Sequence, residues 1–127
     1  MRRMRQSLGY ALAGILHAFE RERNLRLFLA GYVLVVACGI AVRLLAWEWL
    51  ALVLSGGLFF TAELLNTAME RLSDVLDHER KLLGRHAYHV GIRAGKDVAA
   101  AASLVSLITT IIVVLIVFWP YAGIYLF

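Results

Sequence analysis

The fold is decided by the stretch VAAAASLVSLITTIIVVLIVFW, residues 98–119, in which no side chain is charged. An α-helix needs about 20 consecutive apolar residues to cross the hydrocarbon core of a bilayer. The 22 residues of this stretch meet that length, and Pro120 follows them directly. We therefore expect a membrane-spanning helix over 98–119, closed by Pro120.

Two earlier stretches are also apolar enough to cross a bilayer. The first has no charged residue from Leu27 to Val42, and it extends to residue 45 because Arg43 can reach the interface with its long side chain. The second starts at Trp49, and its helical periodicity continues through Ser73. The sequence thus predicts membrane helices over 27–45, 49–73 and 98–119.

The overall composition supports a membrane protein and excludes several other classes. Of the 127 residues, 61% are hydrophobic and the mean hydropathy is +0.75, a balance too apolar for the large surface of a soluble domain of this size. The single cysteine, Cys38, cannot form a disulfide within the chain or build a cysteine metal site. The net charge of +4 does not indicate nucleic acid, because the basic residues cluster between apolar stretches.

The first 24 residues, 1–24, predict an amphipathic helix. Met4, Leu8, Leu12, Ile15 and Phe19 recur at intervals of three or four residues, so they share one helix face. A basic helix with such a stripe is typical of a segment that lies in the membrane surface with its apolar face toward the lipid. Packing of the same stripe against a partner helix is the alternative.

The basic residues indicate the orientation in the membrane. Twelve of the thirteen precede the first span or lie between the second and third, and only Arg43 lies in the other connection. Because loops rich in Lys and Arg stay in the cytoplasm, we expect a cytoplasmic N-terminus and a cytoplasmic loop over 74–97. The chain is then a single multi-pass domain, 1–127, with its C-terminus on the outer side.

A row of polar residues continues along the second span. Glu63, Asn66, Glu70 and Asp74 are spaced at i, i+3, i+7 and i+11, so they project from one face of a helix. A carboxylate facing lipid is costly, and such groups normally face a bundle interior or a polar cavity and mark a functional site. For Asp74 a helix-end charge that reaches the headgroups is an equal alternative, whereas Glu63 lies two turns deeper on a side chain too short for that.

Two further charged clusters lie at the same membrane boundary, namely Glu22 beside the first span and Lys96-Asp97 at the start of the third. Carboxylates together with an amide are hard oxygen ligands that suit Mg²⁺, and Lys or Arg neutralises phosphate. Phosphoryl transfer needs these groups, because the protein's part in it is mainly positioning and charge stabilisation. The residues therefore point to a phosphoryl-transfer site.

Burial of these polar groups predicts a homo-oligomer. Three short spans enclose little interior, so one chain has few helices with which to surround the face of Glu63. A stripe of small residues on the third span, Gly95, Ala99 and Ser103, indicates a close helix contact. We expect that other subunits complete the environment of the Glu63 face.

The segment ELLNTAME, residues 63–70, closely resembles the E-[LI]-[LI]-N-[ST]-A-[IM]-E signature of the small bacterial diacylglycerol kinases, a family that includes the undecaprenol kinases. Two other elements fit the same family, Lys96-Asp97 before an alanine run and Glu22-x-Asn24-x-Arg26. The resemblance covers about residues 3–120. It implies an all-α fold with a surface helix and three transmembrane helices in the bacterial inner membrane, assembled as a homotrimer with active sites shared between subunits.

The resemblance also implies roles for single residues. Glu63 would be the general base for the lipid hydroxyl, supported by Asn66, and Glu22 and Glu70 would be ligands of Mg²⁺. The nucleotide contacts would be Arg3, Tyr10, Tyr88, His89, Lys96 and Asp97, and the lipid contacts Asn24, Arg26 and Glu63. One departure is a longer connection between Asp74 and Lys96, with the extra residues within 75–87 and Ala87 where the family often has a glutamate.

These expectations amount to an ATP- and Mg²⁺-dependent lipid kinase. It would transfer the γ-phosphate of ATP to the hydroxyl of diacylglycerol or undecaprenol, and residues 22–26 and 48–50 favour undecaprenol by resemblance. A non-enzymatic small membrane protein, such as a pore former or an accessory subunit, is the alternative. A lipid phosphatase is disfavoured, since no obvious nucleophile lies beside a histidine in the sequence.

Overall fold

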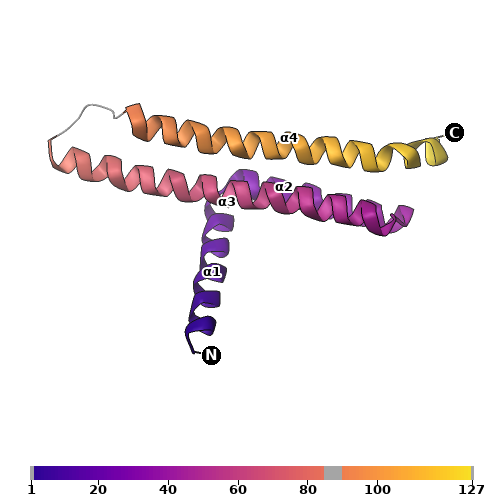
Figure 1. The fold of residues 1–127 in the computed structure, drawn as a ribbon, viewed down its shortest axis with the longest axis horizontal. Coiled ribbons are helices and arrows are strands. Elements are labelled where there is room, and N and C mark those ends of the chain that lie inside the picture. The colour runs from indigo at the N-terminus through magenta and orange to yellow at the C-terminus, as the bar shows by residue number, and fades with distance from the viewer. Residues whose placement is uncertain (1, 85–89, 127) are drawn as a thin grey trace.

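The computed structural model describes residues 2–84 and 90–126, and every regular element in these ranges is an α-helix. The helices are α1 (Arg2–Arg21), α2 (Arg23–Val42), α3 (Ala46–Leu82) and α4 (Val90–Leu126). α3 and α4 have 37 residues each and run side by side in opposite directions. α2 lies along one half of α3, and α1 runs crosswise to the other three helices (Figure 1).

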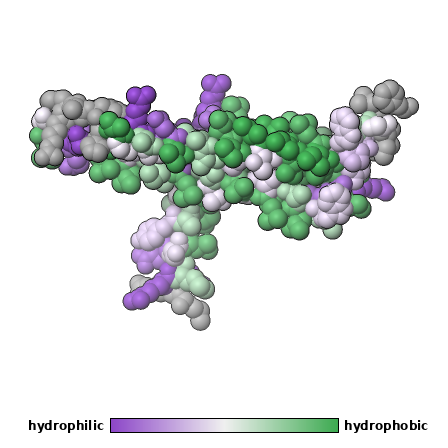
Figure 2. All heavy atoms as spheres, turned by 45° about the horizontal axis from the view of Figure 1, so that its top comes forward, coloured by the Kyte–Doolittle hydropathy of each residue, from purple (hydrophilic) through white to green (hydrophobic). Residues whose placement is uncertain are grey.

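Three of the helices are long and apolar enough to cross a membrane, over Arg23–Val42, Ala46–Leu82 and Val90–Gly123. Figure 2 shows a hydrophobic surface over the half of the bundle that contains α2, while hydrophilic side chains concentrate on α1 and on the other half. Large apolar side chains remain exposed there, as Leu54 and Leu115 illustrate, and lipid is the solvent that accepts such a surface. The prediction of three apolar spans in an all-helical chain is confirmed at this level.

The helix ends differ from the predicted ones in two places. The segment 74–97, expected as a loop, is mostly helical, because α3 continues to Leu82 and α4 starts at Val90. Pro120 does not end the third span but lies inside α4. A proline inside a helix lacks a backbone donor, and its ring crowds the carbonyl four residues earlier. Pro120 is exposed and lies only six residues before the end of α4, where a local adjustment of the backbone accommodates it and the helix continues.

The best-packed part of the bundle is the end formed by the start of α3 and the end of α4, here called the Glu48 end. Leu52 is fully buried and Val117 is 2% exposed, and Leu44 joins them in one apolar cluster. Between α3 and α4, the buried Thr110 hydroxyl donates to the carbonyl of Ser55 over 2.9 Å. Apolar packing and this bond hold α3 and α4 together.

Two aromatic side chains of α2, Tyr32 and Phe28, attach it to α3. The Tyr32 hydroxyl donates to the carbonyl of Leu52 over 2.7 Å. The Tyr32 ring lies against Gly56, where a Cβ atom would come within 2.6 Å of it, so glycine at this position lets α2 approach α3. Phe28 also packs against Phe59, with the two rings tilted by 35° and their centroids 4.0 Å apart.

The junction of α1 and α2 turns the chain through a short extended break at Glu22, with φ −94° and ψ 110°. Arg26 Nη1 donates to the carbonyls of Phe19 and Glu20 at 3.0 and 2.9 Å. These are the otherwise unpaired acceptors at the end of α1, so a cation satisfies them well. The bonds fix the end of α1 against the start of α2, and the region where this junction meets α3 is here called the Glu63 end.

Candidate functional site

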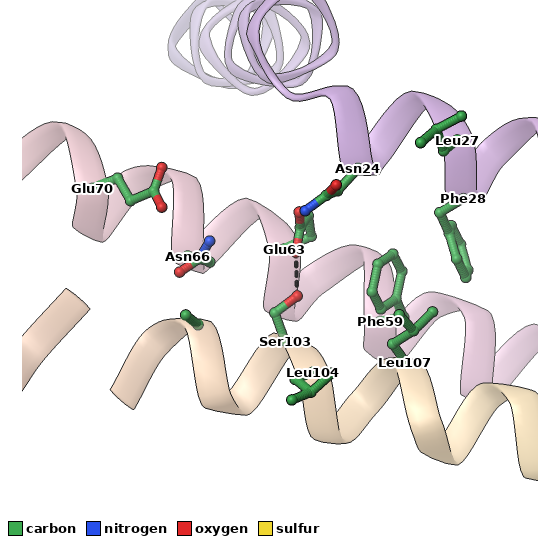
Figure 3. Close-up of a pocket in the computed structure, with 11 residues that line it drawn as sticks. Asn24, Leu27, Phe28, Phe59, Glu63, Asn66, Glu70, Ser103, Leu104 and Leu107 are labelled. Atoms are coloured by element: carbon green, nitrogen blue, oxygen red, sulfur yellow. Dashed lines mark hydrogen bonds between the residues drawn. The ribbon is translucent and has the colours of Figure 1, made fainter. Parts of the chain in front are cut away.

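A cleft of about 500 Å³ opens at the Glu63 end between α2, α3 and α4. Apolar and polar side chains share its walls (Figure 3). The polar ones are Asn24, Glu63, Asn66, Glu70 and Ser103. The apolar ones are Leu27, Phe28, Phe59, Ala100, Leu104 and Leu107. The cleft therefore offers a lipid-like wall beside a row of oxygen and nitrogen groups.

Glu63 is the most deeply buried charged residue of the cleft, with 4% of its surface exposed. Its carboxylate oxygen Oε2 accepts a hydrogen bond from the Ser103 hydroxyl on α4. Figure 3 shows Asn24 pointing toward Glu63 from the start of α2. A buried carboxylate with a hydrogen-bond donor on one side and a cleft on the other is suited to accept a proton from a bound hydroxyl.

Asn66 and Glu70 follow Glu63 along α3, one and two turns further on, and both are half-buried. The Asn66 side-chain oxygen Oδ1 is buried, and among the described residues it has no hydrogen-bond partner. Such an orphaned acceptor in a cleft needs a donor or a cation, because a buried polar atom left unpaired is costly. The predicted row of Glu63, Asn66 and Glu70 on one helix face is thus present and lines one cleft.

Mg²⁺ fits the chemistry of these donors. Carboxylate and amide oxygens are hard ligands, and Mg²⁺ commonly uses one or two carboxylates together with waters and substrate phosphates. Among the residues that the structure describes, no three His, Cys, Asp or Glu side chains form a metal-holding group. Glu22 is half-buried at the α1–α2 junction and does not line the cleft, although Glu70 does.

The predicted lipid contacts divide between the cleft and the junction. Asn24 lines the cleft, as expected. Arg26 does not line it, because its guanidinium is bonded to the last carbonyls of α1. Within one chain, Arg26 therefore shapes the site by fixing the helix that carries Asn24.

Two of the predicted nucleotide contacts, Lys96 and Asp97, lie apart from the cleft in a single chain. Lys96 Nζ pairs with Asp74 Oδ1 at 3.0 Å across α3 and α4. Asp97 is exposed and lies 3.7 Å from the Arg93 side chain of its own helix. Neither Lys96 nor Asp97 lines the cleft.

Of the other predicted nucleotide contacts, the structure describes Arg3 and Tyr10. Arg3 and Tyr10 are exposed on α1, where Gln6 donates to the Tyr10 hydroxyl over 3.1 Å. Tyr88 and His89 lie outside the described residues. The structure therefore brings together the predicted base, amide and one acidic ligand, but not the four predicted nucleotide residues that it describes, Arg3, Tyr10, Lys96 and Asp97.

Two features of the site differ from the sequence analysis. One chain is sufficient to bury Glu63, because Ser103 and the apolar walls of α3 and α4 enclose it, so its burial does not require a second subunit. Ser103 was grouped with Gly95 and Ala99 as a small packing residue, whereas its hydroxyl bonds to Glu63. The signal for that bond is only its register, because 103 falls on the α4 face that packs against α3.

Comparison with known proteins gives a consistent result. The sequence model of the family "Prokaryotic diacylglycerol kinase" matches residues 9–118. An undecaprenol kinase from Bacillus subtilis is 32% identical over 120 residues, covering 94% of this chain and 91% of that protein. A diacylglycerol kinase from Synechocystis is 35% identical over 107 residues, covering 84% of this chain but only 57% of the relative.

The family match spans most of the chain, including the cleft on α2, α3 and α4 and both ends of the ELLNTAME segment. The relative from Bacillus subtilis covers nearly the full length of both proteins. This chain therefore belongs to the prokaryotic diacylglycerol kinase family and is a membrane lipid kinase.

Proposed function

We propose that this lipid kinase transfers the γ-phosphate of ATP to the hydroxyl of a membrane lipid alcohol in the Glu63 cleft. Glu63 takes the hydroxyl proton, the lipid oxygen forms a bond to the γ-phosphorus, and the bond from that phosphorus to the bridging oxygen of ADP breaks. The observation that supports this assignment most directly is the buried carboxylate that faces a cleft with lipid-like walls. An apolar wall suits the hydrocarbon of the acceptor, and the carboxylate suits its hydroxyl.

Mg²⁺ is part of the proposal. When it is bound with ATP, it neutralises charge on the phosphates. Glu70 and Asn66 are the groups in the cleft that would hold it, and Glu22 is the additional ligand suggested by sequence. If so, Glu70→Gln raises the Mg²⁺ concentration that gives half-maximal activity, since mass action partly offsets a lost ligand. An unchanged Mg²⁺ titration in both Glu70→Gln and Glu22→Gln would argue against this ligand set.

Undecaprenol is the acceptor that we favour over diacylglycerol. The relative whose whole length this chain nearly covers is named an undecaprenol kinase, whereas the diacylglycerol kinase relative is covered over 57% of its length. Purified protein in lipid bilayers should be given radiolabelled ATP with undecaprenol or diacylglycerol in parallel. We expect labelled undecaprenyl phosphate, and Glu63→Gln should lower its rate of formation by about 10²- to 10⁴-fold. Efficient labelling of diacylglycerol alone would reverse the choice of substrate, and labelling of neither would overturn the proposed function.

The Glu63 end is proposed to face the cytoplasm, where ATP is available. Support comes from the basic residues, twelve of which precede the apolar part of α2 or lie between the apolar parts of α3 and α4. A reporter inserted near Arg80 should be cytoplasmic, and one fused after Phe127 should be external. Two reporters in the same compartment would contradict this orientation.

A shared active site in a homotrimer completes the proposal. Within one chain, Lys96 and Asp97 do not line the cleft with Glu63, so a site that uses all of them needs a second subunit or a rearrangement. Mixing two inactive variants, Glu63→Gln and Lys96→Leu, would produce some intact sites if subunits share them. Recovery of activity in the mixture is the expected result, and a mixture as inactive as either parent would indicate complete sites within each chain.

A further inference from the structure

Ser103 is the residue of the cleft whose chemistry the sequence did not suggest. It lies on α4, is 6% exposed, and points its hydroxyl across the helix contact to Glu63 on α3 (Figure 3). In the described part of the chain, this is the hydrogen bond that reaches the Glu63 carboxylate. The two side chains belong to helices that approach each other along their whole length.

The surroundings make this hydrogen bond important. Phe59, Leu104 and Leu107 line the same cleft, so the carboxylate sits beside apolar groups. A hydrogen bond to a charged group in such a place is stronger than one in water, and it also restricts a glutamate side chain that has three rotatable bonds. Donation to Oε2 leaves Oε1 as the oxygen that can face a substrate hydroxyl in the cleft.

Neighbouring hydroxyls on the same face of α4 show what a purely structural serine does. Ser106 is equally buried, at 5% exposed, but its hydroxyl donates to the carbonyl of Ser103 in its own helix over 2.8 Å. Thr110 bonds to backbone carbonyls of Ser106 and Ser55. Serine and threonine hydroxyls in helices commonly donate to nearby backbone carbonyls. Ser103 differs because its acceptor is the carboxylate of the proposed base.

We propose that Ser103 is a positioning residue for phosphoryl transfer, holding Oε2 of Glu63 so that the other oxygen is presented to the lipid hydroxyl. The inference rests on the proposed function of Glu63 as the base. A general base works only within hydrogen-bond reach of the proton that it removes, so a carboxylate free to rotate is in the productive position less often. Loss of Ser103 should therefore lower kcat and leave the KM values for ATP and lipid nearly unchanged.

The experiment compares Ser103→Ala with Ser106→Ala in the full-length protein in bilayers. Both changes remove one buried hydroxyl from the same face of α4, so packing effects are matched. We expect Ser103→Ala to lower kcat by about 10- to 100-fold, the range for losing one hydrogen bond to a charged group. Ser106→Ala should stay within about threefold of wild type, which corresponds to a neutral intrahelical bond. Ser103→Thr keeps the hydroxyl and should recover most of the lost kcat.

The Glu63→Gln background separates positioning from packing. If Ser103 acts through Glu63, adding Ser103→Ala to Glu63→Gln should lower the residual rate little further, because coupled residues are not additive. A full further loss in that background, or equal kcat in Ser103→Ala and Ser106→Ala, would overturn the inference. Wild-type activity in Glu63→Gln would instead overturn the proposed function, so the two failures are distinguishable.

Discussion

Two glutamates on α3 are buried to the same degree but have different surroundings. Glu48 is 3% exposed and Glu63 is 4% exposed. Glu48 Oε2 accepts hydrogen bonds from the backbone N–H of Leu45 at 2.7 Å and from the Tyr121 hydroxyl at 2.8 Å. It therefore joins the start of α3 to the end of α4, next to the apolar cluster of that end.

Among the described residues, Ser103 is the one donor to the Glu63 carboxylate, which borders an open cleft. Burial of a carboxylate is thus not sufficient to indicate function, because at the Glu48 end it serves to join two helix ends. The distinguishing features at the Glu63 end are the space for a ligand and the neighbouring polar groups Asn66 and Glu70. A well-packed Glu48 end lets the Glu63 end remain open without loss of the fold.

The largest expected effect separates these two glutamates. Glu63→Gln should lower the phosphoryl-transfer rate by about 10²- to 10⁴-fold, the usual contribution of a positioned base. Glu48→Gln is the same substitution at an equally buried residue, but it should keep the rate within about threefold of wild type. Rates from labelled ATP in bilayers give the comparison. Equal losses in the two variants would show that burial alone, and not the cleft, determines the effect.

Substitutions at the Glu48 end should affect stability more than substitutions at the Glu63 end, the reverse of their expected effects on activity. Leu52→Ala removes a fully buried side chain from the Glu48 cluster and should lower the free energy of unfolding by about 2–5 kcal/mol. Leu104→Ala in the cleft wall removes a side chain that is 57% exposed, and should change it by less than about 1 kcal/mol. Denaturant unfolding in mild detergent measures both. A larger loss for Leu104→Ala would place the stabilising core at the Glu63 end.

Adjacent glycines test how α2 is attached. Gly56→Ala places a Cβ within 2.6 Å of the Tyr32 ring, and should cost about 1–3 kcal/mol through overpacking. The next residue, Gly57, is exposed and has open space around it. Gly57→Ala should therefore leave the free energy of unfolding unchanged or raise it by about 0.5–1 kcal/mol through helix propensity. The same unfolding measurement applies. Equal effects would mean that Tyr32 moves aside freely and does not anchor α2.

Much of the fold could be predicted from the sequence, because long apolar stretches and 3.6-residue periodicity report directly on membrane helices. The shared helix face of Glu63, Asn66 and Glu70 was also predictable, because the spacing of residues along a helix determines the face from which each side chain projects. The sequence analysis follows this helix face only as far as Asp74 and expects a loop beyond it, whereas α3 continues to Leu82. The local propensity of Pro120 likewise predicts a helix stop, but the surrounding helix outweighs it.

The contacts between helices could not be read from the sequence. The pairing of Ser103 with Glu63 and of Tyr121 with Glu48 joins residues 40 and 73 positions apart, so it depends on the register of α3 against α4. Glu48 lies between two tryptophans in the sequence, and this pattern gives no sign of a buried acceptor. The role of Arg26 was similar, because an arginine that bonds helix-end carbonyls has the same sequence signature as one that binds a ligand.

The smallest expected effect concerns the ion pair of Lys96 and Asp74, which lies outside the cleft. The Lys96 side chain is 32% exposed and that of Asp74 is 65% exposed, so Asp74→Asn should change the free energy of unfolding by less than about 1 kcal/mol. If Lys96 serves the nucleotide, Lys96→Leu raises the KM for ATP, whereas Asp74→Asn leaves it unchanged or lowers it by freeing Lys96 from a competing carboxylate. Kinetics at two salt concentrations check this, because screening weakens an exposed pair. An ATP KM raised equally by both substitutions would make Asp74 part of the nucleotide site, and the pair would then belong with Glu63 as functional machinery.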